Sequence, residues 1–214
     1  LSMNDLEILA RKYGTDKRTN DPGQNIYHGY TDIYYEIFKG MRNEKLNIVE
    51  IGVQNGYSTF MFRDFFPNAM IYGIDTFEDI GCKTKVEDIE GDRIKILVAD
   101  QSDEARINEF FRDVELDLIL DDGSHLSKDQ QNSFRILFPK LKSGGYYIIE
   151  DLSVCLNRSF REFDDIRSST LYWLQLIQNN IPFSYYIDHD QMVSFIQQIQ
   201  YVSINGELGI IKKL

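Results

Sequence analysis

The fold is decided by residues 116–152, which read LDLILDDGSHLSKDQQNSFRILFPKLKSGGYYIIEDL. Two short apolar runs in this stretch, at 118–120 and 147–149, each lead into a pair of adjacent acids. Apolar runs of this length, bounded by glycine and charged residues, are typical of strands that are buried in a parallel sheet. Carboxylates pack poorly there, but the carboxyl ends of such strands are where open α/β sheets bind ligands. The stretch therefore predicts a buried sheet with a polar site at one edge.

The preceding chain alternates apolar strand patterns with amphipathic helix patterns. Gly144 and Gly145, after Ser143, predict the stop between a helix and the fifth strand. This alternation indicates an α/β fold with a doubly wound parallel sheet and right-handed crossovers. We expect strands at 46–53, 70–75, 93–100, 117–122 and 146–151, helices at 57–66, 103–113 and 127–141, and a loop with a short helix at 76–91.

The C-terminal segment differs from a plain dinucleotide-binding fold. After a long helix expected at 160–180, residues 199–204 and 208–213 predict an antiparallel hairpin around the Asn205-Gly206 turn. A parallel sheet finished by a hairpin favours the Rossmann-like class I methyltransferase architecture. We therefore expect a mostly parallel seven-stranded sheet with helices on both faces, and we leave residues 183–195 unassigned.

Length and composition indicate a single compact domain, because 214 residues suffice for one sizeable core. We expect a helical and aromatic lid segment at 1–45, with helices near 4–13 and 30–41, followed by a methyltransferase domain at 46–214. The net charge of −11 argues against a nucleic-acid partner.

Targeting signals are not evident in the sequence. No apolar run approaches the ~20 residues that span a bilayer, so we expect no membrane partner. The charged start does not resemble a signal peptide. Only Cys82 and Cys155 are present, which favours reduced thiols over a disulfide framework. Together these features predict a cytoplasmic protein.

The turn after the first strand, Glu50-Ile-Gly-Val-Gln-Asn-Gly56, is typical of a ligand-binding loop. Gly52 lets the backbone approach a ligand, and Asn55 tolerates the left-handed conformation. The next helix, beginning near Ser58, offers its N-terminus to a carboxylate. The turn lacks the G-x-G-x-x-G spacing of a dinucleotide fingerprint.

Acids recur at the ends of successive strands and suggest a nucleoside without phosphates. Asp75 can accept hydrogen bonds from both ribose hydroxyls, and Asp100-Gln101-Ser102 is placed to pair an adenine amine. S-adenosylmethionine fits this pattern. Glu50 and Asp121 are then expected at its amino group and Ser58 at its carboxylate.

A second set of acids suggests a metal. Asp122, Glu150 and Asp151 offer hard oxygen ligands, which favours Mg²⁺, with Mn²⁺ or Ca²⁺ possible, over zinc. His125 is then the candidate general base, the alternative being a structural histidine that fixes the DDGSH turn. In the aromatic loop, His28 and Tyr30 are expected to line the acceptor site.

Eight motifs occur in order along the chain: YGTDK (13–17), HxYxxxY (28–34), VEIGVxxG (49–56), FPNAxIYGID (66–75), DQS (100–102), DDGSH (121–125), LFPxLKxGGxY (137–147) and IEDL (149–152). Together they resemble the metal-dependent sugar O-methyltransferases of the macrocin and mycinamicin type, with cephalosporin hydroxylase-like and rhamnosyl O-methyltransferase relatives. The resemblance implies Mg²⁺ at Asp122, Glu150 and Asp151, with His125 as the base. It also implies that YGTDK, including Tyr13 and Thr15, closes over the methionine end of S-adenosylmethionine, which Glu50, Asp75, Asp100 and Asp121 surround.

The expected function is transfer of a methyl group from S-adenosylmethionine to a hydroxyl of a sugar, a sugar-containing natural product or a polysaccharide. One alternative keeps the chemistry but changes the acceptor to a catechol, an antibiotic hydroxyl or a phosphorus-linked oxygen. Two others are an NAD-dependent oxidoreductase and a binding module without chemistry. Because related enzymes commonly associate, we also expect a homo-oligomer.

Overall fold

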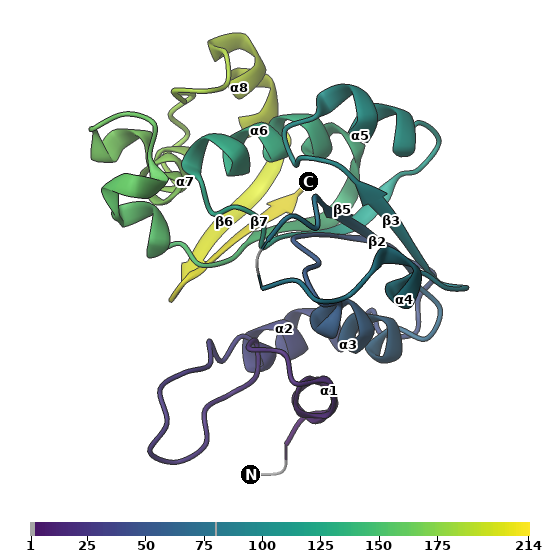
Figure 1. Cartoon of the computed structure of the whole chain (residues 1–214). Helices are drawn as coiled ribbons and strands as arrows, with labels where there is room; N and C mark the ends of the chain where they lie inside the picture. The colour runs from purple at the N-terminus through teal and green to yellow at the C-terminus, as the bar shows by residue number, and fades with distance from the viewer. Residues whose placement is uncertain (1–2, 80) are drawn as a thin grey trace.

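The structure, a computed structural model, describes residues 3–79 and 81–214. Residues 1 and 2 of the expected lid segment and residue 80 of the expected loop lie outside the described residues. One sheet crosses the described part of the chain, with the strand order β3-β2-β1-β4-β5-β7-β6 (Figure 1). The strands are β1 Asn47–Ile51, β2 Met70–Asp75, β3 Ile94–Val98, β4 Leu116–Asp121, β5 Leu141–Ile149, β6 Ile199–Asn205 and β7 Leu208–Lys213.

The direction of the strands confirms the fold class expected from the sequence. Strands β1 to β5 pair in parallel, whereas β7 runs antiparallel to both β5 and β6. The hairpin turns at Gly206, whose φ of 61° is a conformation that glycine adopts without cost. The carboxyl ends of β1 to β5 therefore meet along one edge of a seven-stranded sheet.

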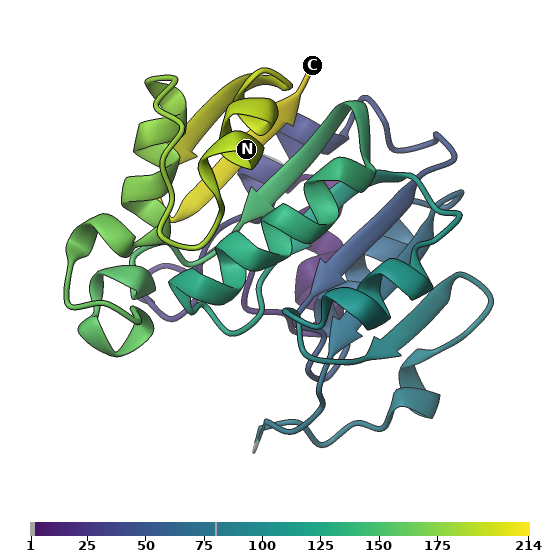
Figure 2. The same cartoon turned by 90° about the horizontal axis from the view of Figure 1, so that it is seen from above.

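Helices cover both faces of the sheet, and each face has its own apolar cluster (Figures 1 and 2). One cluster packs α5 to α8 against the sheet through residues such as Phe134 and Trp173. The other packs α1 to α3 through residues such as Leu6, Phe38 and Phe62. The helices are α1 Asp5–Tyr13, α2 Thr31–Phe38, α3 Tyr57–Phe65, α4 Val86–Ile89, α5 Glu104–Phe110, α6 Ser127–Leu137, α7 Thr170–Gln178 and α8 His189–Ile196.

The N-terminal segment packs directly on the sheet domain. Asn4 caps α1 by accepting a hydrogen bond from the Glu7 amide at 2.8 Å, and α1 ends at Gly14 with φ 79°. From there, residues 14–30 form a long loop that returns to α2, drawn in purple in Figure 1. Among the described residues, no helix combines the length and the apolar character that crossing a bilayer requires.

The stop predicted at Gly144-Gly145 is wrong. Helix α6 ends at Leu137, a short 3₁₀ turn η1 (Phe138–Lys140) follows, and β5 already begins at Leu141. The two glycines lie inside this strand, where the pairing with β4 shifts register and Gly144 has φ 79°. They form an irregularity in the strand, which glycine permits because it reaches positive φ.

The long helix expected at 160–180 is also wrong, because only its second half forms, as α7. Residues 154–168 instead make three 3₁₀ turns: η2 (Val154–Leu156), η3 (Arg158–Phe160) and η4 (Ile166–Ser168). Asp165 accepts a hydrogen bond from the Arg167 amide, and Ser169 accepts one from the Tyr172 amide. Such local side-chain bonds compete with a continuous helix. The unassigned stretch 183–195 contains most of α8.

Candidate active site

A cavity of about 560 Å³ lies along the carboxyl ends of β1 to β5. Loops after these strands form most of its wall, and the N-terminal loop closes one side with Gly14, Thr15 and Asp16. This is the edge where open α/β sheets bind ligands. The remaining lining includes Gly52, Gln54, Ser58, Asp75, Asp100, Gln101, Asp122, Ser124, His125, Asp129 and Asp151.

The turn after β1 approaches the cavity through Gly52. Its φ is 85°, and a Cβ at this position would lie 2.0 Å from the carbonyl oxygen of Asp122. Only glycine fits a positive φ with so close a neighbour. The turn is held by Asp75, whose carboxylate accepts hydrogen bonds from the amides of Val53 and Gln54, both at 2.7 Å. The backbone is thus exposed to a ligand without an intervening side chain.

Six of the predicted cofactor residues line this cavity: Thr15, Gly52, Ser58, Asp75, Asp100 and Gln101. Asp129 lines it as well, which the sequence reasoning missed. Its carboxylate accepts a hydrogen bond from Ser124 Oγ at 2.8 Å, and burial raises its pKa. Its position in the first turn of α6, facing the DDGSH loop, was the available signal.

Three further predicted cofactor residues do not line the cavity, and their assignment stays a prediction. The Tyr13 hydroxyl donates to Asp64 on α3, away from the cavity. Asn55 Oδ1 accepts from the Lys83 amide at 2.9 Å and so braces the following loop. The Ser102 hydroxyl donates to Asp100 Oδ1 at 2.6 Å. All three side chains therefore shape the walls around the cavity without lining it.

Glu50 and Asp121 are fully buried and do not line the cavity, and their assignment to the cofactor amino group stays a prediction. Glu50 accepts a hydrogen bond from Thr59 Oγ1 at 2.5 Å. Asp121 Oδ2 accepts one from the Tyr147 hydroxyl at 3.3 Å, under the sheet edge. Burial raises the pKa of each of these carboxyls to about 7. Side chains alternate along a strand, and Asp121 takes the inward direction while Asp122 faces the cavity.

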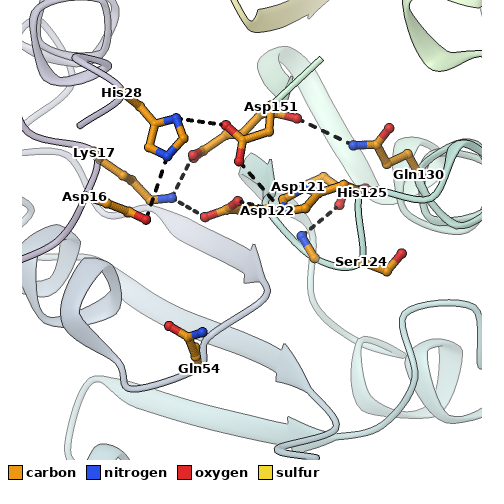
Figure 3. A network of polar contacts seen from close by, with 12 residues as sticks. Asp16, Lys17, His28, Gln54, Asp121, Asp122, Ser124, His125, Gln130 and Asp151 are labelled. Atoms are coloured by element: carbon orange, nitrogen blue, oxygen red, sulfur yellow. Dashed lines mark hydrogen bonds and ion pairs between the residues drawn. The ribbon is translucent and has the colours of Figure 1, made fainter. Parts of the chain in front are cut away.

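Asp122, His125 and Asp151 converge at the cavity (Figure 3). Each offers one ligand atom, and these atoms lie within 4.8 Å of one another. His125 Nε2 is 3.7 Å from Asp151 Oδ2 and 3.9 Å from Asp122 Oδ1. The two carboxylates offer the hard oxygen ligands that Mg²⁺ prefers, and the imidazole lies beside them.

Glu150, the third predicted metal ligand, lies outside this group in the structure, and its assignment to the metal stays a prediction. Its side chain is buried and is already paired on both oxygens. Lys17 Nζ donates to Oε2 at 2.7 Å, and the Tyr34 hydroxyl donates to Oε1 at 2.5 Å. Burial and the neighbouring Asp122 raise the pKa of Glu150 well above its usual value, against the opposing effect of Lys17.

Lys17 is the functional candidate that the sequence reasoning missed. Its ammonium is buried and contacts both Asp122 and Glu150. Figure 3 shows Lys17 beside Asp122. Burial alone would lower the pKa of Lys17, but these carboxylates hold it well above its usual value. The available signal was the YGTDK motif itself, in which a lysine follows an acid in a loop otherwise assigned to the cofactor.

His28 and Tyr30, the predicted acceptor residues, both contact Asp151. His28 Nδ1 lies 3.2 Å from Asp151 Oδ1, and the Tyr30 hydroxyl donates to the same oxygen. Both line a second cavity of about 440 Å³, together with the turn of the β6–β7 hairpin. Asp151 therefore lines the first cavity and contacts two residues that line the second.

Backbone strain marks the same cluster. His125 and Asp151 have φ values of 57° and 56°, which are uncommon for residues with a Cβ. Within the described residues, His125 Nδ1 is buried without a hydrogen-bond partner. Strain and an unpaired polar atom persist where the surrounding structure enforces them, and they gather at functional sites.

Comparison with known proteins agrees with this geometry. Residues 49–152 match a family described as a methyltransferase domain. Demethylmacrocin O-methyltransferase of Streptomyces fradiae is 33% identical over 183 residues, which cover 82% of this chain and 43% of that protein. An 8-demethyl-8-(2-methoxy-alpha-L-rhamnosyl)-tetracenomycin-C 3'-O-methyltransferase of Streptomyces olivaceus is 33% identical over 160 residues, covering 69% of this chain and 37% of that protein. The chain thus spans less than half the length of these curated relatives.

Solved structures show the same similarity. The MycE methyltransferase of the mycinamycin biosynthetic pathway, solved in complex with Mg, SAH and mycinamycin VI, superposes with a TM-score of 0.80 at 25% sequence identity. The match covers 98% of this chain and 54% of that chain.

Proposed function

The segment at residues 49–152 belongs to the methyltransferase domain family, and from that premise we propose that the chain is a Mg²⁺-dependent O-methyltransferase. It moves a methyl group from S-adenosylmethionine to a hydroxyl of a sugar or of a sugar-containing product. The observation that carries the proposal is the convergence of Asp122, His125 and Asp151 on a cavity that also contains the Gly52 turn.

The proposed cofactor site is the part of the cavity around the glycine turn. The close approach at Gly52 leaves bare backbone for the methionine end, with Thr15 and Ser58 beside it. Asp75 and Asp100 lie farther along the strand ends, where carboxylates suit ribose hydroxyls and an adenine amine. Both already accept backbone hydrogen bonds, so their orientation is fixed before a ligand arrives.

In the proposed metal site, Asp122 and Asp151 hold the cation, with Glu150 as the third proposed ligand. The cation, when bound, lowers the pKa of an acceptor hydroxyl and so favours its alkoxide at neutral pH. His125 is proposed to take the proton, because an imidazole is suited to proton transfer near neutral pH and Nε2 faces both carboxylates. The left-handed backbone at His125 directs the ring toward this position.

A sugar is the proposed acceptor because the relatives' names describe sugar-bearing acceptors, among them rhamnosyl tetracenomycin and an olivosyl macrolide. The second cavity, with His28 and Tyr30, offers polar and aromatic groups next to Asp151. Such groups suit a hydroxylated ring. Residues 1–45 are proposed as the lid segment beside the domain at 46–214. A homo-oligomer and a cytoplasmic location stay predictions.

The proposal is tested by product analysis with an acceptor panel. The protein is incubated with S-adenosylmethionine, Mg²⁺ and either methyl α-L-rhamnoside, a rhamnosyl polyketide, catechol or a phosphonate, and products are identified by mass spectrometry. We expect a mass increase of one methyl group on a saccharide acceptor. Methylation of catechol alone would move the function to the alternative acceptor class. Binding of NADH in place of S-adenosylhomocysteine would overturn the methyltransferase proposal.

A further inference from the structure

A buried cation lies behind the proposed metal site. The side chain of Lys17 is only 1% exposed, and its ammonium donates to Asp122 Oδ2 and to Glu150 Oε2. Asp122 comes from the end of β4 and Glu150 follows β5, whereas Lys17 belongs to the N-terminal loop. One side chain from outside the sheet thus joins the ends of two neighbouring strands.

We propose that Lys17 is a positioning residue for the metal-binding carboxylates, an inference that rests on the proposed function. By holding Oδ2 of Asp122, it leaves Oδ1 turned toward His125, 3.9 Å from Nε2. By pairing with Glu150 as well, it links the carboxylates at the ends of β4 and β5.

The charges around the site support this role. Asp122, Glu150 and Asp151 place three carboxylates at two adjacent strand ends, which repel one another when buried. The ammonium of Lys17 offsets one of these charges. Without Lys17, one buried carboxylate would lack a partner.

Lys17 is held firmly, which a positioning role requires. Its carbonyl oxygen accepts hydrogen bonds from the amides of Tyr30 and Thr31, at 2.9 and 3.2 Å. Nearby, buried Glu7 accepts from both the amide and the hydroxyl of Thr19, at 3.0 and 2.7 Å, and from the Thr31 hydroxyl. The N-terminal loop is therefore closed at its base, and its docking sets the geometry of the carboxylates.

The test is metal affinity, measured by electron paramagnetic resonance of free Mn²⁺ in the presence of S-adenosylhomocysteine. Lys17→Met is compared with the wild type and with Lys12→Met, which removes an exposed lysine that also pairs with an aspartate. We expect Lys17→Met to weaken Mn²⁺ binding by about 10- to 100-fold, the range typical of outer-shell partners. Lys12→Met should bind Mn²⁺ like the wild type.

Unchanged or tighter Mn²⁺ binding by folded Lys17→Met would overturn the inference while leaving the proposed function intact. Failure of the wild type to bind Mn²⁺ would instead overturn the proposed metal site. If Lys17→Met does not fold, the comparison is repeated in a Glu150→Gln background, where the loss of Lys17 leaves no unpaired charge at residue 150. The Lys17→Met, Glu150→Gln double variant should then bind Mn²⁺ at least about 10-fold more weakly than Glu150→Gln alone, and equal binding would contradict the inference.

Discussion

Single residues in this chain hold unfavourable backbone angles where the proposed chemistry needs them. His125 and Asp151 both have positive φ. Gly52 also has positive φ, and a Cβ there would lie 2.0 Å from the carbonyl oxygen of Asp122. Each lies at the end of a different central strand, β4, β5 and β1. The rigid sheet compensates for this strain, which costs of order 1–3 kcal/mol per residue.

Replacing His125 should abolish turnover but not cofactor binding. General bases contribute at least about 100-fold to rate, so His125→Ala should lose that factor or more. His125→Asn should behave alike while tolerating the left-handed backbone. Release of S-adenosylhomocysteine measures turnover, and calorimetry measures its affinity. His189→Ala, in α8, is the control and should keep full activity; retained turnover in both His125 variants would remove the base assignment.

Gly52→Ala should be far more damaging than Gly23→Ala, although both glycines have nearly the same φ, 85° and 84°. At Gly23 a Cβ would meet nothing within 4 Å, so only backbone strain of about 1–2 kcal/mol is expected. At Gly52 the Cβ would collide with the Asp122 carbonyl, which forces β1 and β4 apart. Chemical denaturation and binding of S-adenosylhomocysteine check this, and similar losses at both sites would contradict it.

Glu50 should make stability depend on pH. Burial raises its pKa from 4.5 to about 7, so between these values the folded protein holds a proton that the unfolded chain has lost. Its contribution to the free energy of unfolding therefore falls as pH rises through this window, by a few kcal/mol at most. Glu50→Gln should flatten the dependence in denaturation curves from pH 5 to 8. Glu36→Gln, which alters an exposed acid, should not.

At the scale of elements, hydrophobic pattern predicted the sheet well. Strand β2 has the expected bounds, and the hairpin lies where the Asn-Gly turn places it. The misses have local causes. Gly144-Gly145 is equally compatible with a helix stop and a strand irregularity, and residues 160–169 have helical spacing but carry Asp165 and Ser169 as caps. At Gly144-Gly145, only the pairing of β5 with β4 in the folded protein decides between a helix stop and a strand irregularity.

The sequence also predicts part of the candidate site. Strand-end acids identify the edge of the sheet, but not which acid faces the cavity, because a shift of one residue reverses the direction of a side chain. Glu50 and Asp121 are buried and do not line the cavity, whereas Asp122 lines it. Lys17 and Asp122 are 105 residues apart in the sequence, so no local pattern predicts their contact.

The start of α7 should depend on its cap. Ser169 is fully buried and its hydroxyl accepts from the Tyr172 amide at 3.2 Å. Ser169→Ala should lower the free energy of unfolding by about 1 kcal/mol, since it leaves a helix N-terminus without its side-chain acceptor. Ser159→Ala, at an exposed serine in η3, should have little effect. Equal stability of the two variants in urea denaturation would argue against the cap.

At the scale of the whole molecule, the fold gathers distant segments at one edge of the sheet. The loops after β1 to β5 supply the glycine turn and the acids, and the N-terminal loop adds Lys17, His28 and Tyr30 from the other side. The two apolar clusters hold the sheet between its helix layers, which keeps the strand ends in register. The site therefore needs the complete α/β unit and its N-terminal segment together.

Metal dependence of methyl transfer tests the central claim most directly. Transfer from S-adenosylmethionine to a rhamnosyl acceptor is measured after treatment with EDTA and again after Mg²⁺ is restored, for the wild type and for Asp122→Asn. We expect EDTA to abolish transfer, Mg²⁺ to restore it in the wild type, and Asp122→Asn to stay at least about 100-fold slower. Full methyl transfer in the presence of EDTA would contradict it.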